Sequence, residues 1–261
     1  MEIYSKKKIA ILVISCDKYS DLWEPCTKVF NKYWPDCPYD KYLASNIKKI
    51  DSYGFSPILM GEDKSWSYGL KGVLTKLEEK YEYVFTLLED YYFIDKLDNE
   101  YMTKMFDSFV LADGNFLRLL KVLKPQIKYF NEFFGETENY TPYRQTCVFT
   151  LWKIETLKDI LKDDENAWEF EKIGVKRGFH YDKFFCVYKN KFKVINVVIK
   201  GKLVPKSYKI LKRILPEVNL DRCSFTFIEM AIMSVRDFCV LTFLRFVPKK
   251  IRSKIYFIKN K

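Results

Sequence analysis

The stretch "YEYVFTLLEDYYFID" (residues 81–95) decides the fold. Its apolar run from Val84 to Leu88 ends in two acids, Glu89 and Asp90, and aromatic residues follow at once. A short, continuous apolar run is typical of a strand buried on both faces, as in parallel sheets. Open α/β sheets bind their ligands at the carboxyl ends of such strands. The stretch therefore predicts a buried strand that delivers two carboxyl groups to the ligand-binding edge of a sheet.

The residues before this stretch repeat the alternation of strand and helix. Ile9–Ile14 is again continuously apolar, and residues 22–34 have helical spacing that Pro35 ends. We expect strand, helix, strand, strand, helix and strand at residues 9–14, 22–34, 40–46, 56–63, 65–81 and 84–88. This order predicts an α/β protein with an open, mostly parallel sheet.

The residues after this stretch are less regular. We expect a helix at 99–113, a strand at 115–121, strand fragments and loop at 122–142, a strand at 144–152, one or two helices at 153–174 and a strand pair or hairpin at 191–204. From residue 206 the chain turns basic and helical. The simplest division is one catalytic-sized domain, 1–205, with a C-terminal extension, 206–261.

Composition indicates a folded protein with an anionic partner. The chain has 261 residues, 48% of them hydrophobic, and a formal net charge of +11. Such a charge favours nucleic acid, a nucleotide or a membrane surface as partner, although a solvated, lysine-rich surface explains part of the excess.

The cysteines and apolar runs exclude other classes. The seven cysteines form no C-x-x-C pair and His180 is the only histidine, so a zinc site is not expected. We interpret the cysteines as reduced thiols of a cytosolic protein. No run reaches the roughly 18 apolar residues of a spanning helix, so we expect a soluble protein or one that lies on a membrane without crossing it.

Acidic residues follow three of the expected strands. Asp17, residues 61–63 and the pair Glu89–Asp90 all lie at strand ends. Two carboxylates can hold a hard divalent cation such as Mg²⁺ or Mn²⁺, and the cation can neutralise a diphosphate. The alternative is a turn with solvated acids.

Three segments carry a family resemblance. They are "ILVISCDKYSDLWEPCTKVFNKYWPDCPYDKYLASN" (11–46), "WSYGLKGVLTKL" (66–77) and "YVFTLLEDYYF" (83–93), with weaker matches in "QTCVFTLW", "AWEFE" and "KGKLV". Together they resemble a group of bacterial glycosyltransferases of the GT-A type over roughly residues 8–205. The resemblance implies a GT-A-like, Rossmann-type mixed sheet flanked by helices, with a nucleotide-sugar half at about 1–115 and an acceptor half at about 116–205.

The resemblance also implies site residues. Glu89 and Asp90 would hold Mn²⁺ or Mg²⁺. However, Glu89 replaces the first Asp of the family's Asp-x-Asp motif and Tyr91 stands at the second, which leaves metal independence open. The donor-binding residues would be Ser15, Asp17, Ser67, Lys71, Glu89, Asp90 and Lys202. The acceptor-binding residues would be Arg144, Gln145 and Trp168.

The catalytic base is expected in "KDDENAWEFEKIG" (162–174). An inverting transfer needs a base for the acceptor hydroxyl, and by resemblance Glu169 or Glu171 is the candidate, with preference for Glu169. Trp168 shares a helix face with Glu171. Alternatively, the acids mark a helix start capped by Asp163, Asp164 or Asn166.

The tail, residues 228–261, combines apolar helical spacing with basic residues, which suits an anionic membrane interface. A packed C-terminal helix and a dimerisation helix are the alternatives. The peripheral site would be the inner face of the cytoplasmic membrane.

The preferred function is transfer of a sugar from a nucleotide diphosphate donor to a glycan or lipid-linked glycan of the bacterial surface, in lipopolysaccharide or capsule. A sugar nucleotidyltransferase is the rival enzyme, although "SCDKYSD" (15–21) lacks the glycine of a phosphate loop. The rival binding protein would be a basic nucleic-acid or membrane-surface protein. Nucleic acid is not expected, because the basic excess is mostly C-terminal. Donor, acceptor, stereochemistry and oligomeric state stay open.

Overall fold

A computed structural model describes residues 4–50, 53–122, 124–139, 141, 144–248 and 251. The strands are β1 (Ile9–Ile14), β2 (Asp40–Ser45), β3 (Ser56–Leu59), β4 (Tyr83–Leu88), β5 (Tyr91–Phe93), β6 (Phe116–Arg118), β7 (Phe134–Glu136), β8 (Thr150–Lys153), β9 (Phe184–Val187), β10 (Val194–Asn196), β11 (Val198–Ile199) and β12 (Lys202–Leu203). The α-helices are α1 (Trp23–Tyr33), α2 (Trp66–Glu78), α3 (Asn99–Leu111), α4 (Ile154–Ile160), α5 (Ala167–Lys172), α6 (Pro205–Ile214) and α7 (Phe227–Phe246). The 3-10 helices are η1 (Tyr4–Lys7), η2 (Asp17–Leu22) and η3 (Gly174–His180).

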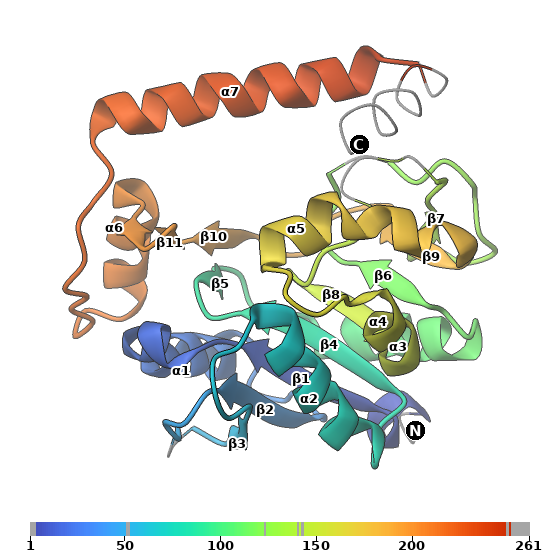
Figure 1. Ribbon diagram of the computed structural model, residues 1–261, viewed down its shortest axis with the longest axis horizontal. Coiled ribbons are helices and arrows are strands. Elements are labelled where there is room, and N and C mark those ends of the chain that lie inside the picture. The colour runs from blue at the N-terminus through green and yellow to red at the C-terminus, as the bar shows by residue number, and fades with distance from the viewer. Residues whose placement is uncertain are drawn as a thin grey trace.

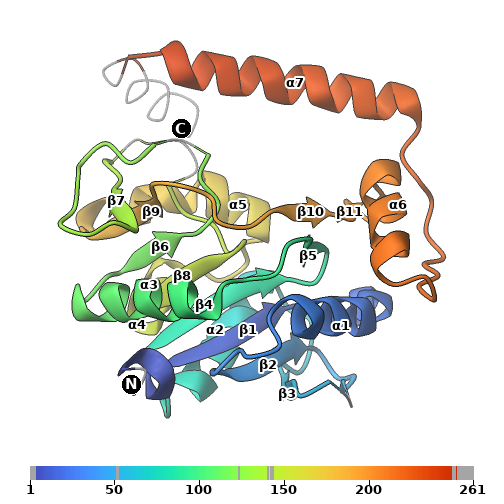
Figure 2. The same ribbon diagram turned by 180° about the vertical axis from the view of Figure 1, so that it is seen from behind.

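A mixed sheet forms the centre of the molecule (Figures 1 and 2). Its order is β3-β2-β1-β4-β8-β6-β9-β7. The strands β3, β2, β1 and β4 run parallel, whereas β8 is antiparallel to both of its neighbours, β4 and β6. This arrangement confirms the predicted α/β class and the Rossmann-type mixed sheet.

Strand β1 explains why the sheet needs helices on both faces. Its residues 9, 11 and 13 belong to one core cluster, with Phe30 of α1 and Phe106 of α3. Residues 10, 12 and 14 belong to the other, with Leu74 of α2 and Leu157 of α4. Successive strand residues point to opposite faces, so a continuously apolar strand is covered on both sides.

Strand β4 ends at Leu88, and Glu89 and Asp90 form the turn that leads into β5. The second apolar stretch has its own partner, because β5 pairs with β10 in a separate two-stranded sheet. The side chains of Tyr92 and Phe93 are buried there. The acids therefore lie between two buried strands.

The segment after β12 returns to the body of the protein. Leu211 of α6, Val218 and Leu220 are buried in the same core cluster as α1. Ser224 forms a parallel bridge with Leu203 of β12. The first part of the extension thus packs on the domain.

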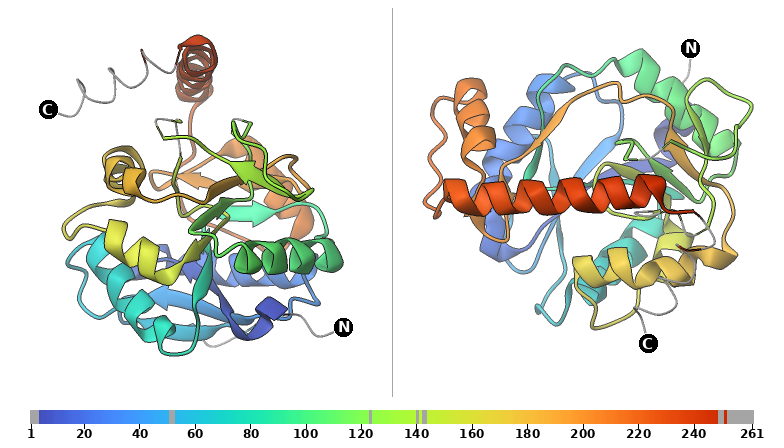
Figure 3. Two further views of the ribbon diagram at one scale, coloured as in Figure 1. Left: turned by 90° about the vertical axis from the view of Figure 1, so that its right-hand side faces the viewer. Right: turned by 90° about the horizontal axis from the view of Figure 1, so that it is seen from above.

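Helix α7 differs from every other helix by running clear of the sheet along one side of the molecule (Figures 1 and 3). Six large apolar side chains of α7 are between 64% and 88% exposed: Phe227, Ile228, Ile232, Val235, Phe238 and Phe246. Among the described residues, no helix combines the length and the apolar character that crossing a bilayer requires. Residues 249, 250 and 252–261, which include six basic residues of the predicted tail, lie outside the described residues.

Some elements differ from the sequence-based expectation. The expected hairpin at 191–204 is divided: β10 pairs with β5, and β11 and β12 form a hairpin of their own. The expected strands at 56–63 and 144–152 are shorter, at 56–59 and 150–153. The seven cysteines all lie among the described residues, and none of them forms a disulfide bond.

Candidate functional site

Two buried carboxyl groups define the candidate site. Glu89 is only 8% exposed, and one carboxylate oxygen of Asp90, Oδ1, is buried without any hydrogen-bond partner among the described residues. The backbone of the turn is fixed, because the Val197 N–H donates to the carbonyl oxygen of Asp90 at 2.8 Å. A buried polar atom with no partner is costly, and it points to a ligand that supplies the missing contact.

Burial sets the protonation of this pair. Loss of solvent raises the pKa of Asp90 to about 7 and raises the pKa of Glu89 well above its usual range. The charge of Asp90 raises the Glu89 pKa further, whereas Ser15 and Arg222 lower it. The hydroxyl of the neighbouring Tyr92 is also buried without a partner, and both acids raise the pKa of Tyr92 after the larger effect of burial.

The pair suits a hard divalent cation that shares its ligands with a substrate. Carboxylate oxygens are ligands that Mg²⁺ and Mn²⁺ prefer, and Mg²⁺ commonly takes one or two carboxylates together with substrate phosphates. The described residues contain no group of three or more histidine, cysteine or acidic side chains that could hold a metal. Glu89 and Asp90 therefore fit a cation completed by a phosphate ligand better than a closed, all-protein metal site.

Arg222 lies much later in the chain and pairs with Asp21 of η2, the helix that follows β1, the parallel neighbour of β4. Its Nε donates to Asp21 Oδ2 at 2.7 Å, its Nη2 also bonds Asp21, and its guanidinium carbon lies 4.6 Å from the centre of the Tyr19 ring. Arg222 lowers the pKa of both Glu89 and Asp90. Sequence reasoning missed Arg222, because no local pattern links residues 200 positions apart.

Ser15 and Asp17 lie at the carboxyl end of β1, as expected, but their side chains have protein partners. The Ser15 hydroxyl accepts a hydrogen bond from Trp23 Nε1 at 2.7 Å. The Asp17 carboxylate accepts the backbone N–H groups of residues 46, 47 and 48 at 3.0–3.2 Å. Asp17 is the first residue of η2, and its carboxylate therefore ties η2 to the loop after β2.

Ser67 and Lys71 of α2 contact the loop before α5. The buried Ser67 hydroxyl accepts the N–H of Glu165 at 3.1 Å, and Lys71 forms an ion pair with Asp163 at 2.8 Å. Ser65 caps α2 by accepting the N–H of Tyr68. The structure thus gives Ser67 and Lys71 protein partners and brings neither into contact with the Glu89–Asp90 turn.

The two acids of α5 have different surroundings. Asn166 caps α5, and the Glu169 carboxylate accepts the N–H of Asn166 at 2.9 Å, which completes a capping box. Glu171 instead accepts a hydrogen bond from the Thr146 hydroxyl. Burial raises the pKa of Glu171, Arg118 lowers it, and Glu171 in turn raises the pKa of Tyr91 in β5. Glu169 is thus occupied in capping its own helix, whereas the charge of Glu171 acts on Tyr91, the first residue of β5.

The three predicted acceptor-binding residues separate into buried and exposed positions. Arg144 donates to the carbonyl oxygens of Gly178 and Tyr181 and stacks on Phe184, while its Nε has no hydrogen-bond partner among the described residues. Gln145 donates to the carbonyl oxygen of Phe170. Trp168 is 53% exposed. Only Trp168 presents a surface to solvent.

Lys202 and its neighbours form the tight hairpin between β11 and β12. Lys200 and Gly201 have φ of 50° and 79°, the left-handed conformations that a two-residue turn of this kind needs. Lys202 is paired with Glu229 of α7 at 2.6 Å. In this conformation, Lys202 is bound to the start of α7.

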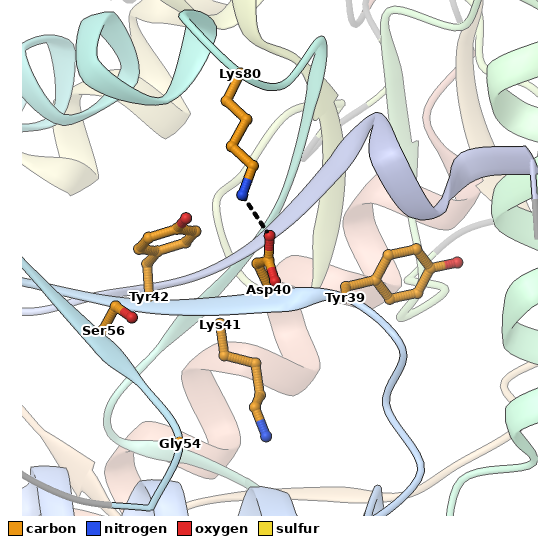
Figure 4. A pocket seen from close by; sticks show the side chains of 7 residues that line it. All are labelled: Tyr39, Asp40, Lys41, Tyr42, Gly54, Ser56 and Lys80. Atoms are coloured by element: carbon orange, nitrogen blue, oxygen red, sulfur yellow. Dashed lines mark hydrogen bonds and ion pairs between the residues drawn. The ribbon is translucent and has the colours of Figure 1, made fainter.

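A polar pocket lies at the opposite edge of the sheet, at the amino ends of β2 and β3 (Figure 4). It has a volume of about 370 Å³, and Asp40, Lys41, Tyr42, Ser56 and Lys80 are among its lining residues. Lys80 is paired with Asp40 at 2.9 Å, so this pocket already has internal partners for its charges.

Comparison with known proteins supports the fold. No family model matches the chain, and no curated protein matches its sequence. A cytidylyltransferase from Leptospira borgpetersenii has a similar structure, with 12% identity and a TM-score of 0.50 over 90% of this chain and 96% of that one. TarS from S. aureus aligns with 11% identity and a TM-score of 0.44 over 82% of this chain and 40% of that one. At 12% identity the likeness to the cytidylyltransferase concerns the fold alone.

Proposed function

We propose that this chain is a glycosyltransferase that moves a sugar from a nucleotide diphosphate donor to a glycan or lipid-linked glycan of the bacterial surface, with inversion at the anomeric carbon. The observation that carries the proposal is the pair of buried acids after β4, with a partnerless oxygen on Asp90. Such a pair at the carboxyl edge of an α/β sheet suits a cation-bound diphosphate. The sequence resemblance adds the reaction class.

In this proposal Glu89 and Asp90 hold Mg²⁺ or Mn²⁺. When bound, the cation neutralises charge on the donor diphosphate and on the nucleotide that leaves. The raised pKa of Asp90 means that a cation competes with a proton for this carboxyl group below about pH 7.

We propose Glu171 as the general base. It takes the proton of the acceptor hydroxyl while that oxygen forms its bond to the anomeric carbon, and the bond from that carbon to the diphosphate oxygen breaks. The leaving nucleoside diphosphate keeps the electron pair. The raised pKa of Glu171 makes its carboxylate a stronger base than a solvated one. Trp168, three residues away and exposed, offers a platform for an acceptor sugar.

A donor screen tests the proposal. Thermal unfolding is measured with UDP, CDP, GDP and ADP and with their sugar conjugates, each with and without Mn²⁺. We expect one nucleotide to raise the Tm of the wild-type protein, and to raise it more with Mn²⁺ than without. In Asp90→Asn, Mn²⁺ should not add to the increase in Tm. If no nucleotide or nucleotide sugar changes the Tm, with or without Mn²⁺, the proposal that this protein uses a nucleotide sugar is refuted.

A sugar nucleotidyltransferase is the second candidate, and the shared fold with a cytidylyltransferase favours it. Against it, residues 15–21 contain no glycine for a phosphate loop. The same protein is incubated with CTP or UTP and a panel of sugar 1-phosphates. Release of pyrophosphate would establish the second candidate, and we expect none.

We further propose that α7 and the basic tail bind an anionic membrane surface at its cytoplasmic face. The exposed apolar side chains of α7 supply area that membrane lipid can cover. Residues 248–261 add six basic side chains, each of which contributes on the order of 1 kcal/mol near an anionic surface.

Vesicle binding tests this part. Binding to vesicles with anionic lipid should fall sharply on deletion of residues 248–261 and weaken with added salt. Changing Lys249, Lys250 and Arg252 to Gln should weaken it, whereas the same change at Lys209, Lys212 and Arg213 of α6 should not. If both triple changes weaken vesicle binding equally, the binding depends only on the net charge of the protein, and the proposed role of the tail is wrong.

A further inference from the structure

The segment after α6 places a cation beside the acid pair. The Leu203 N–H donates to the carbonyl oxygen of Cys223 at 2.8 Å, and the Phe225 N–H donates to the carbonyl oxygen of Leu203 at 2.9 Å. These bonds hold residues 223–225 against β12. Arg222 is the residue immediately before them, so its backbone position is fixed by the sheet and not by a free loop.

The side chain of Arg222 is held on one side only. Nε and Nη2 bond Asp21, Nη2 also donates to the carbonyl oxygen of Lys18 at 3.3 Å, and the guanidinium stacks on Tyr19. Nη1 donates no hydrogen bond to any described residue. A guanidinium presents five N–H donors in a rigid fork, and here part of that fork remains available.

Asp21 is not the only acidic residue at the sheet edge where Arg222 is held. Strands β1 and β4 are parallel neighbours with Ile14 opposite Leu88, so η2, which carries Asp21, and the Glu89–Asp90 turn follow at the same edge of the sheet. Arg222 is paired with Asp21 at this edge, and its side chain is 13% exposed. A cation bound at Glu89 and Asp90 would offset their charge and leave the Arg222 fork to an anion. Arginine is well suited to phosphate because its fork matches two phosphate oxygens.

We propose that Arg222 binds the diphosphate of the donor at the Glu89–Asp90 turn, and that Asp21 is the positioning residue that aims it. The C-terminal segment therefore completes the donor site. This inference rests on the proposed function, since it names a further residue of the same site. It goes beyond that function because the diphosphate contact comes from a residue outside the segments that carry the family resemblance.

Equilibrium binding tests the inference with a matched pair of ligands. The nucleoside diphosphate that binds the wild-type protein best, among UDP, CDP, GDP and ADP, is compared with its monophosphate by calorimetry, in Mg²⁺ and in EDTA. We expect Arg222→Gln to weaken the diphosphate on the order of 10- to 100-fold and the monophosphate far less, because a charge-assisted contact to the second phosphate is lost. The ratio of the two affinities should then fall toward one.

Two further variants make the result decisive. Arg236→Gln is the matched control, because Arg236 of α7 is likewise paired with an aspartate, Asp237, at 2.8 Å, and it should bind both ligands like the wild type. Asp21→Asn keeps the charge of Arg222 but loosens its aim, so it should reduce the same ratio by a smaller factor. If Arg222→Gln does not fold, the affinity ratio of Asp21→Asn tests the role of Arg222 in its place.

The outcomes separate the two proposals. A wild-type protein that binds no nucleoside diphosphate refutes the proposed function. A wild-type protein that binds one, with a diphosphate-to-monophosphate ratio that neither Arg222→Gln nor Asp21→Asn changes, refutes the role of Arg222 and leaves the donor site intact.

Discussion

Two aspartates at opposite edges of the sheet have contrary surroundings. Asp40 starts β2 and has two partners, the Tyr81 hydroxyl and the Lys80 ammonium, whose bonds hold its pKa below the usual range. Figure 4 shows its pairing with Lys80. Asp90 follows β4, has a buried oxygen without a partner, and has a pKa raised to about 7. The Asp40 carboxylate therefore has hydrogen-bonding partners in the protein, whereas one buried oxygen of Asp90 has none among the described residues.

This difference separates acids that serve the fold from acids kept for a ligand. A carboxylate with its partners in place contributes to stability, whereas a carboxylate buried without them costs free energy at neutral pH. Asp17 and Glu169 belong with Asp40, since backbone N–H groups occupy both. Asp90 and Glu89 are the pair for which we expect a functional reason.

The largest expected effect concerns turnover. Asp90→Asn should reduce transfer by at least about 10²-fold while the fold is retained, because the charge that holds the donor's cation is lost. Since β4 has ended at Leu88 and Glu89 is buried in the turn beside the half-buried Asp90, Glu89→Gln should also be impaired. Asp40→Asn should turn over like the wild type. Normal steady-state rates for Asp90→Asn would remove the proposed role.

The next effect compares the two acids of α5. Glu171→Gln should lose about 10²-fold or more in turnover, the scale of a missing general base, with donor affinity unchanged. Glu169→Gln should keep its turnover and lose about 1 kcal/mol of unfolding free energy or less, since it weakens only a capping box. Reversed results would return the base to Glu169, and two active variants would exclude both acids.

A third effect is a pH dependence of stability. A buried acid whose pKa rises on folding favours the folded state at low pH, and this stability is lost as the pH rises from about 4 through about 7. The shift corresponds to at most about 4 kcal/mol, from 1.36 kcal/mol per pH unit. Denaturant titrations without divalent cation should therefore find Asp90→Asn more stable than the wild type at pH 8 and equal to it near pH 4. A difference that does not vary with pH would contradict this.

The smallest effect has the opposite sign. The lowered pKa of Asp40 stabilises the folded protein above the ordinary pKa of 3.8, and this stability is lost as the pH falls below that value. Asp40 and Lys80 are both more than half exposed, so Asp40→Asn should cost no more than about 1 kcal/mol at pH 7. A destabilisation several times larger would mean that this pair is structural in its own right.

Local patterns predicted most of the fold. The apolar run 9–14 and the strand end at Leu88 each depend on near neighbours, and each is confirmed. The division of residues 191–204 was not predicted, because the partner of β10 is β5, some hundred residues earlier.

The site was less predictable for the same physical reason. The preference for Glu169 had a warning in the sequence, because Asn166 and Glu169 have the spacing of a capping box. The partners of Ser67 and Lys71 lie near residue 165, and Arg222 finds Asp21 across 201 positions. Such contacts follow from tertiary folding and have no local signature.

The pairing of Arg222 with Asp21 has a consequence for synthesis of the protein. A ribosome adds about 5–20 residues per second, so roughly 10–40 s pass between the appearance of Asp21 and that of Arg222. Strands β1 to β4 are made within the first 88 residues, so the acid turn exists long before its arginine does. A nascent chain released before residue 222 would carry the acids of the site without this arginine, and only a chain translated past Arg222 could acquire the complete site.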